Sequence, residues 1–213
     1  MEIVNSLAQQ YAEKYTTIED ELIKEVADYT IANHQMSQML SGHLQGKLLE
    51  MISCMIRPTK ILEIGTFTGY SALCLAKGLT EDGVLHTIEL REEEAAIAQK
   101  FFDRSFQREK IVLHVGDALQ IIDELEETWD LVFIDADKPG YINYFNRVLL
   151  KVRRNGFILA DNVLFHGEVL TNPVSGKNAI AIQAFNDFVN GRSDVEKLML
   201  PLRDGIYLIK KIA

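Results

Sequence analysis

The chain has 213 residues, of which 47% are hydrophobic and 25% charged, and this composition predicts a single globular α/β domain with a sizeable core. With 22 Lys and Arg against 31 Asp and Glu, the net charge of −9 argues against a phosphate-tracking surface, so no nucleic acid partner is expected. No apolar run is long enough to span a membrane and no signal-peptide pattern opens the chain, so we expect a cytoplasmic protein without membrane attachment. Cys54 and Cys74 lie in apolar helical patterns, which predicts buried thiols, with a disulfide as the weaker alternative.

Residues 1–57 are predicted to be helical. Apolar residues recur at helical spacing over 18–31, after an acidic first turn, and again over 44–55. The second pattern stops before Pro58, which cannot continue a helix. Residues 36–42 between the two patterns are predicted to form a non-helical link.

From residue 60 onward, apolar strands and amphipathic helices alternate, which predicts a mostly parallel sheet with crossover helices on both faces. The predicted strands are 60–64, 84–89, 111–115, 130–135 and 156–161, with helices at 70–78, 91–106, 117–125 and 140–151. A loop at 166–177, a helix over 177–190 and two closely spaced strands at 195–200 and 205–211 complete the chain. The last two strands indicate an antiparallel hairpin at one sheet edge.

A glycine turn joins the first predicted strand to its helix, with glycines at positions 65 and 69. Such a turn places backbone N–H groups around a ligand at the carboxyl end of the strand. A dinucleotide fingerprint needs small residues where Phe67 and Tyr70 stand, and the ending of a P-loop is absent. Glu63 would repel a pyrophosphate but suits a cation. The Glu-x-Gly-x-x-x-Gly pattern is therefore similar to the first motif of S-adenosylmethionine (SAM) methyltransferases, and a plain strand–turn–helix is the alternative.

Two further strand ends carry candidate cofactor residues. Glu89 ends the second strand about 20 residues after the glycine turn, where an acid accepts hydrogen bonds from the ribose hydroxyls of an adenosine cofactor. The alternative is a charge flanking the acidic run 89–94. The third strand ends at Gly116, which allows close approach, and Asp117, which can cap the next helix or line the adenine.

The fourth and fifth predicted strands deliver oxygen ligands to one sheet edge. Asp135 follows the fourth strand, and Asp161 and Asn162 follow the fifth. Adjacent parallel strands end at the same level, so two carboxylates and an amide oxygen can converge on a hard divalent cation, with Lys138 beside it. Helix capping and loop solvation are the alternative roles of the acids. No zinc-type Cys/His spacing occurs, and His166 is interpreted as a loop histidine rather than a substrate contact.

Taken together, the motifs resemble the cation-dependent O-methyltransferases, which include caffeoyl-CoA and catechol O-methyltransferases. The resemblance covers nearly the whole chain. It is carried by Met39-Leu40-Ser41-Gly42 with Gln45-Gly46, Asp135-Ala136-Asp137-Lys138, Tyr141-Ile142-Asn143-Tyr144, Asp161-Asn162-Val163-Leu164 and Asp204-Gly205-Ile206. It implies a class I SAM-methyltransferase fold, with a helical cap (1–57) over the cofactor cleft of an α/β core (58–213).

The resemblance also implies roles for individual residues. The expected SAM contacts are Met39, Ser41, Glu63, Gly65, Thr66, Tyr70, Ser71, Glu89, Gly116, Asp117, Ala118, Asp135 and Asp137. Asp135, Asp161 and Asn162 would bind the metal, with Mg²⁺ expected and Mn²⁺ or Ca²⁺ as alternatives. Asp135 and Lys138 would form the catalytic pair, with Lys138 as general base or substrate orienter. Family members pair into homodimers, so a homodimer is expected here.

These observations predict methyl transfer from SAM to a hydroxyl of a catechol-like phenolic small molecule. Lys138, desolvated beside a cation, is expected to have a lowered pKa and to take the phenol proton. Two alternatives come from other classes. One is a metal-independent SAM methyltransferase acting on an amine or an RNA base, and the other is a non-catalytic module that retains the cofactor fold.

Overall fold

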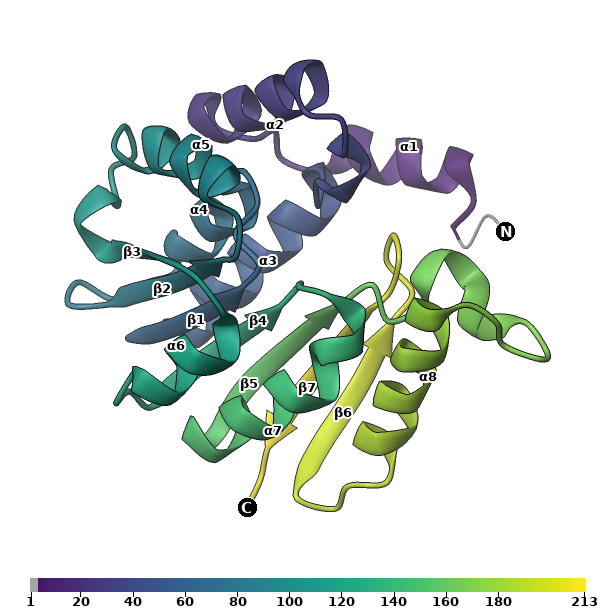
Figure 1. Ribbon diagram of the computed structural model, residues 1–213. Coiled ribbons are helices and arrows are strands. Elements are labelled where there is room, and N and C mark those ends of the chain that lie inside the picture. Colours follow the sequence, from purple (N-terminus) through teal and green to yellow (C-terminus); the bar gives the residue numbers. More distant parts are fainter. Residues whose placement is uncertain (1–3) are drawn as a thin grey trace.

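A computed structural model describes residues 4–213 and places a seven-stranded sheet at the centre of the fold (Figure 1). The strand order is β3-β2-β1-β4-β5-β7-β6. Five strands run parallel: β1 (Lys60–Ile64), β2 (Val84–Glu89), β3 (Ile111–Val115), β4 (Trp129–Ile134) and β5 (Val152–Asp161). β7 (Ile206–Lys211) lies antiparallel between β5 and β6 (Val195–Leu200). The predicted mostly parallel sheet with an antiparallel pair at one edge is confirmed.

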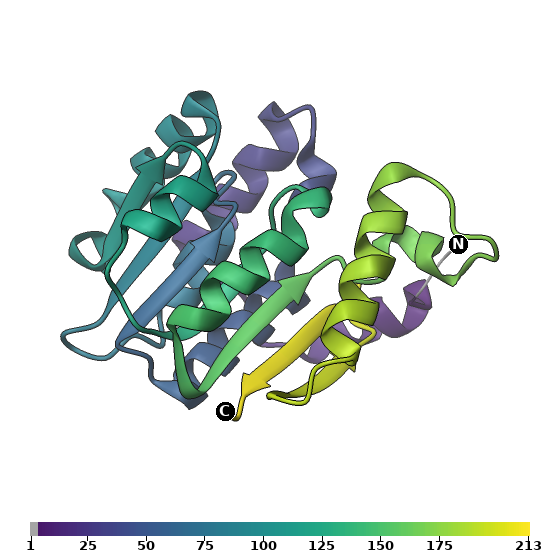
Figure 2. The ribbon, with the colours of Figure 1, turned by 60° about the horizontal axis from the view of Figure 1, so that its bottom comes forward.

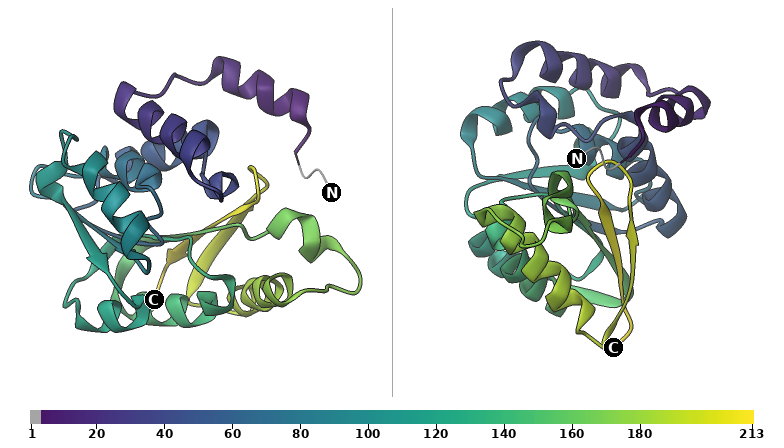
Figure 3. Two further views of the ribbon diagram at one scale, coloured as in Figure 1. Left: turned by 45° about the horizontal axis from the view of Figure 1, so that its top comes forward. Right: turned by 90° about the vertical axis from the view of Figure 1, so that its right-hand side faces the viewer.

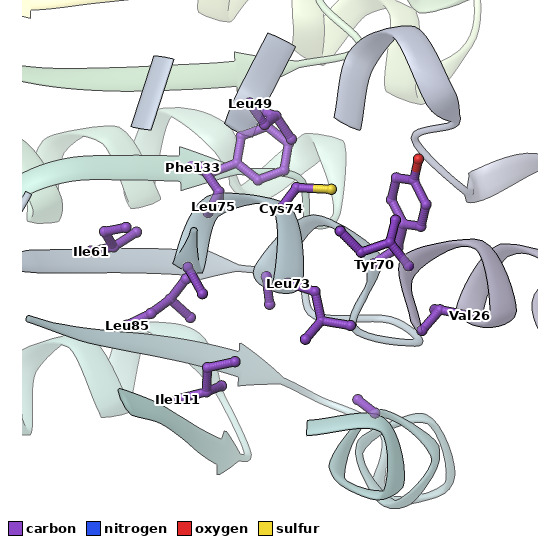
Figure 4. Packing of buried hydrophobic residues seen from close by; sticks show 14 of the residues in the cluster. Val26, Leu49, Ile61, Tyr70, Leu73, Cys74, Leu75, Leu85, Ile111 and Phe133 are labelled. Atoms are coloured by element: carbon purple, nitrogen blue, oxygen red, sulfur yellow. The ribbon is translucent and has the colours of Figure 1, made fainter. Parts of the chain in front are cut away.

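Helices cover both faces of the sheet. α2 (Glu21–Asn33), α3 (His43–Ile56), α4 (Tyr70–Ala76) and α5 (Glu92–Phe102) contribute to one apolar core. α6 (Ala118–Glu124), α7 (Tyr141–Lys151) and α8 (Lys177–Asn190) contribute to the core on the opposite face (Figure 2). Central strands are buried on both faces, and this explains why they appear in the sequence as continuous apolar runs. In the first core, side chains of α2, α3 and α4 pack over the sheet (Figure 4).

Residues 6–33, which contain the first two helices, lie above the sheet (Figure 3, left). α1 (Ser6–Tyr15) begins after Asn5, whose side chain accepts hydrogen bonds from the first-turn N–H groups, and it buries none of its residues. The predicted link after α2 contains one 3₁₀ turn, η1 (Ser37–Met39), and the loop before α8 contains another, η4 (Phe165–Leu170). Short 3₁₀ turns also precede β3, at η2 (Arg108–Lys110), and α7, at η3 (Lys138–Gly140). No helix within residues 4–213 has the length and apolar character needed to cross a bilayer.

Three predictions about local structure are wrong. The helix predicted over 91–106 ends at Phe102, and Phe106, the last residue of the predicted helix, is fully exposed. The fifth strand begins at Val152 instead of residue 156, since a register shift against β4 and a positive φ at Asn155 let the chain enter the sheet early. Cys54 is exposed because it lies on the face of α3 that points away from the sheet, whereas Cys74 is buried as predicted, and both thiols are free.

Two histidines pair between β2 and the edge strand β3. His86 of β2 and His114 of β3 are half-buried, and Nδ1 of His86 lies 2.9 Å from Nε2 of His114. One nitrogen donates and the other accepts, so the hydrogen bond requires at least one neutral ring. Burial, together with the neighbouring His114 ring, lowers the pKa of His86, and burial lowers the pKa of His114.

This pair predicts acid destabilisation. Above about pH 6.5 the rings are neutral in both the folded and the unfolded chain, so their hydrogen bond contributes fully to stability. Below that pH the unfolded chain takes up more protons, and stability falls. We expect the melting temperature to drop more steeply between about pH 7 and pH 5 in wild type than in His86→Gln. His43→Gln is the control, because His43 is partly exposed and its Nε2 contacts the Thr17 carbonyl oxygen instead of a second histidine. Identical pH slopes in wild type and His86→Gln would contradict the prediction.

Candidate functional site

The carboxyl ends of the parallel strands open onto a cavity of about 1280 Å³. Its walls include the ends of β1, β2, β4 and β5, the start of α1 and the segment 36–41. The predicted site residues that line it are Met39, Ser41, Gly65, Thr66, Tyr70, Ser71, Glu89, Gly116, Asp117, Ala118, Asp135, Asp137, Lys138 and Asn162. Two predicted residues, Glu63 and Asp161, are fully buried behind the cavity wall. Open α/β sheets bind ligands at this edge.

The glycine turn owes its shape to the close approach of two strands. Gly65 has a φ of 99°, and a Cβ there would lie 2.1 Å from the carbonyl oxygen of Asp135. Any side chain would therefore push the ends of β1 and β4 apart. Gly69 has a φ of 92° and precedes α4, so the turn points the start of this helix toward the cavity.

Glu63 is a buried acid with one unpaired oxygen. Its Oε2 accepts a hydrogen bond from the Thr87 hydroxyl at 2.5 Å, whereas Oε1 has no partner among residues 4–213. Burial raises the pKa of Glu63 to about 8. A buried acid with spare acceptor capacity is compatible with a positively charged ligand in the adjoining cavity.

Glu89 stands at the end of β2 and holds the glycine turn. Its Oε2 accepts a hydrogen bond from the N–H of Phe67 at 2.7 Å, and its Oε1 accepts one from the N–H of Arg91 at 3.1 Å. Both carboxylate oxygens are thereby oriented at the cavity wall. Glu89 lines the cavity and also caps the neighbouring backbone, so the two interpretations of this acid from the sequence are compatible.

If Glu89 accepts hydrogen bonds from both ribose hydroxyls of SAM, as its position at the end of β2 predicts, Glu89→Ala should weaken SAM binding by roughly 1.5–3 kcal/mol. Calorimetric titration with SAM measures the change. Glu92→Ala, at an exposed acid in the first turn of α5, is the matched control. If the dissociation constant were the same in all three proteins, Glu89 would serve only the backbone.

Three other predicted contacts have additional structural roles. Asp117 is the N-cap of α6 and accepts from the N–H of Gln120 at 3.1 Å, so the capping interpretation holds alongside its place in the cavity wall. Asp137 accepts from the N–H of Gly140 at 3.0 Å and from the Tyr144 hydroxyl. The Tyr70 hydroxyl donates to Glu19, which does not line the cavity.

Asp135, Asp161 and Asn162 converge at the ends of β4 and β5, as their strand positions predict. Lys138 joins the group, with its Nζ 3.0 Å from Asp135 Oδ1 and 2.6 Å from Asn162 Oδ1. Asp161 Oδ1 accepts from the N–H of Asn162 at 2.7 Å. Burial, and then the nearby Asp135 carboxylate, raises the pKa of Asp161 to about 7.

The pKa of Lys138 was expected to be lowered beside a bound cation, and the protein groups by themselves shift it in the opposite direction. Burial acts against the ammonium form, but the Tyr141 hydroxyl and the Asp135 carboxylate outweigh it and raise the pKa of Lys138 above its usual range. The Tyr141 hydroxyl lies 2.9 Å from Nζ and is anchored to the backbone oxygen of Asp161 at 3.0 Å. With the groups of this chain alone, Lys138 is a charged donor.

The oxygen set has the chemistry of a hard-cation site. Two carboxylates and an amide oxygen are the ligand types that Mg²⁺ takes. Burial is the main cause of the raised pKa of Asp161, and the Asp135 carboxylate adds a smaller contribution that a cation would offset. Within residues 4–213, no cluster of three or more His, Cys, Asp or Glu could hold a metal. The set therefore depends on the amide of Asn162, and a bound cation would compete with the Lys138 ammonium for Asp135 and Asn162.

Several residues without a role predicted from the sequence support the oxygen set or line the cavity. Gln45 donates to Asp161 Oδ2 at 2.6 Å, Arg203 reaches Gln45, and Tyr141 supports Lys138. Asp204 lines the cavity and accepts from the N–H of His166 at 2.5 Å, while its Oδ2 has no hydrogen-bond partner in the described chain. His166 also lines the cavity, although its side chain is 71% exposed. Gln45, Tyr141 and Asp204 lie in the motifs that carry the family resemblance, and these motifs are the only indication in the sequence that the three residues belong to the site.

Comparisons with known proteins agree with this geometry. The sequence model of the O-methyltransferase family matches residues 12–212. This chain belongs to the O-methyltransferase family. The protein named "Probable caffeoyl-CoA O-methyltransferase 2" of Dictyostelium discoideum is 35% identical over 211 residues, covering 96% of this chain and 90% of the relative.

Two solved structures of O-methyltransferases resemble this chain over nearly its whole length. The O-methyltransferase TomG of Streptomyces achromogenes, solved with SAM, has a TM-score of 0.88 at 29% identity and covers 97% of this chain and 96% of its own. An O-methyltransferase of Bacillus cereus, solved with SAH, has a TM-score of 0.85 at 28% identity, with coverage of 96% and 97%. The predicted methyltransferase fold and the SAM-dependent O-methyltransferase class are confirmed.

Proposed function

We propose that this O-methyltransferase transfers the methyl group of SAM to one of two vicinal hydroxyls on a catechol-like phenolic small molecule, with a divalent cation bound beside the acceptor. The observation that carries the proposal is the convergence of Asp135, Asp161 and Asn162 with Lys138 at one end of the cavity. A metal-independent methyltransferase acting on an amine or an RNA base would not need this oxygen set.

The cofactor is assigned to the glycine-turn side of the cavity. The residues proposed to contact SAM are Met39, Ser41, Gly65, Thr66, Tyr70, Ser71, Glu89, Gly116, Asp117, Ala118, Asp135 and Asp137, with Glu63 acting from behind the wall. SAM supplies a methyl group on a sulfonium, and the enzyme must align that carbon with the acceptor oxygen. Oriented acceptors at Glu89 and the helix start at α4 support this placement.

The acceptor is assigned to the end of the cavity that holds Lys138. A divalent cation held by Asp135, Asp161 and Asn162, with Mg²⁺ the proposed ion, would supply positive charge to stabilise a phenolate oxygen. Lys138 binds and orients the acceptor oxygen through its ammonium, which the groups of this chain favour. It accepts the phenol proton when a second positive charge beside it disfavours its charged form.

We also propose a single domain, 1–213, that acts as a cytoplasmic homodimer. The first 57 residues form the helical cap and 58–213 the SAM-binding core. One exposed face of α1 supports an assembly, because Leu7, Tyr11 and Tyr15 recur at four-residue spacing and are 73%, 66% and 67% exposed.

Paired acceptors test the proposed function. Each catechol is assayed beside its monohydroxy analogue by methyl transfer from labelled SAM. Two adjacent hydroxyls can fill two open cation positions together, whereas a lone phenol fills one and gains no chelate orientation. We expect methylation of the diols and much slower methylation of the mono-ols. Equal rates within each pair would favour the metal-independent alternative.

A further inference from the structure

A buried amide connects α3 to the end of β5. Gln45 is 1% exposed, and its Nε2 donates to Oδ2 of the fully buried Asp161 at 2.6 Å. The other carboxylate oxygen of Asp161 accepts from the N–H of Asn162 at 2.7 Å. Each oxygen of this carboxylate therefore has its own donor, so the orientation of the Asp161 side chain is set from two directions.

The other end of the Gln45 amide meets a guanidinium. Nη1 of Arg203, in the turn between β6 and β7, donates to Gln45 Oε1 at 3.4 Å, and Nη2 donates to the carbonyl oxygen of Gln38 at 2.8 Å. With an acid at Nε2 and a cation at Oε1, the amide has only one favourable orientation. Arg203 adopts a φ of 52°, a conformation that residues with side chains rarely take.

Arg203 thereby links two parts of the site that are far apart in the sequence. Gln38 belongs to η1, and Gln38, Met39 and Ser41 line the cavity. The same guanidinium holds this segment and the amide that orients Asp161. Neither Gln45 nor Arg203 belongs to the oxygen set or to the residues assigned to SAM.

We propose that Gln45 is a positioning residue for Asp161 and that Arg203 couples Gln45 to the segment 37–41. The hydrogen bonds of one guanidinium would then hold both the orientation of a cation ligand and the position of a segment that lines the cavity. This inference rests on the proposed cation site. The hydrogen bond from Gln45 orients the Asp161 carboxylate before the cation binds. The bond from Arg203 to the Gln38 carbonyl keeps the segment 37–41 ordered before SAM binds.

The positioning role of Gln45 is tested by titrating the protein with Mn²⁺ alone and measuring the free ion by electron paramagnetic resonance. We expect Gln45→Leu to raise the Mn²⁺ dissociation constant by about 10–100-fold, the usual effect of losing a residue that orients a metal ligand. SAM affinity without metal should stay within about twofold, since Gln45 does not line the cavity. Gln99→Leu is the matched control, because Gln99 Nε2 donates to Asp103 at 2.7 Å in an exposed pair of the same chemistry.

Arg203→Lys tests the coupling while keeping the charge. A lysine cannot reproduce the fork that spans two acceptors. We expect the SAM dissociation constant to rise about tenfold, the effect of losing one hydrogen bond to a charged donor, together with weaker Mn²⁺ binding. Thermal melting of each variant verifies that it is folded.

The outcomes separate the inference from the proposed function. If the wild-type protein bound no Mn²⁺, the proposed cation site would be wrong. If wild type and Gln45→Leu bound Mn²⁺ equally, the cation site would stand and the positioning role of Gln45 would be overturned. Unchanged SAM and Mn²⁺ binding in folded Arg203→Lys would overturn the coupling.

Discussion

Asp161→Asn is expected to reduce methyl transfer on the order of 10³-fold, because it removes the charge of a cation ligand that stabilises the developing phenolate. SAM binding should remain close to that of wild type, since Asp161 is not among the residues assigned to SAM. The exchange keeps the shape of the side chain and one oxygen to accept from Gln45, while the bond that the second oxygen accepts from the N–H of Asn162 is lost. Turnover with labelled SAM and calorimetric SAM titration measure the two effects separately.

Asp161→Asn lowers activity, but it is not expected to lower thermal stability at alkaline pH. Because burial raises the pKa of Asp161 to about 7, the folded chain binds more protons than the unfolded one between its unfolded pKa and that value. Its contribution to stability is therefore lost as the pH rises through about 7, where the buried charge forms. We expect Asp161→Asn to melt at least as high as wild type at about pH 8, and added Mg²⁺ to raise the melting temperature of wild type only.

The control for both measurements is Asp103→Asn, an exposed acid at the end of α5. Chelation provides an independent check, since EDTA should abolish the activity of wild type and Mg²⁺ or Mn²⁺ should restore it. Full activity in EDTA-treated protein would refute the proposed cation requirement.

Lys138→Ala is expected to lower kcat on the order of 10²–10⁴-fold, the usual contribution of a positioned proton-transfer group. Lys138 is the only residue in the described chain whose Nζ contacts Asp135, Tyr141 and Asn162, so the variant loses a charge and three hydrogen bonds at the acceptor end. Lys138→Arg should not restore the rate, because a guanidinium stays protonated and is too broad for this three-oxygen pocket.

The pH dependence of kcat separates the two roles of Lys138. Loss of one limb of the pH–rate profile in Lys138→Ala would identify it as the base, whereas an unchanged profile with a lower rate would identify it as an orienting ammonium. Lys100→Ala, at an exposed lysine in the last turn of α5, is the control. A kcat equal to that of wild type in Lys138→Ala would exclude both roles.

Local patterns in the sequence predict much of the fold. The bounds of β1, β2, β3 and α8 agree with those predicted, because each is a short periodic segment between residues that interrupt it. Strand order alone also predicted that Asp135, Asp161 and Asn162 would meet, since parallel strands bring their carboxyl ends to one edge. The sequence prediction failed at Phe106, where the chain has already left α5, and at Cys54, which lies on the face of α3 that points away from the sheet.

The support and the charge of the site depend on contacts that form when the chain folds. Gln45 and Asp161 are separated by 116 positions, and their contact depends on how α3 packs on the sheet, which no spacing in the sequence encodes. The direction of the Lys138 pKa shift depends on a balance between burial, which lowers the pKa, and the Tyr141 and Asp135 oxygens around Nζ, which raise it, and this balance is not encoded by residue type. Electrostatic effects add over distances in space, and those distances arise only when the chain folds.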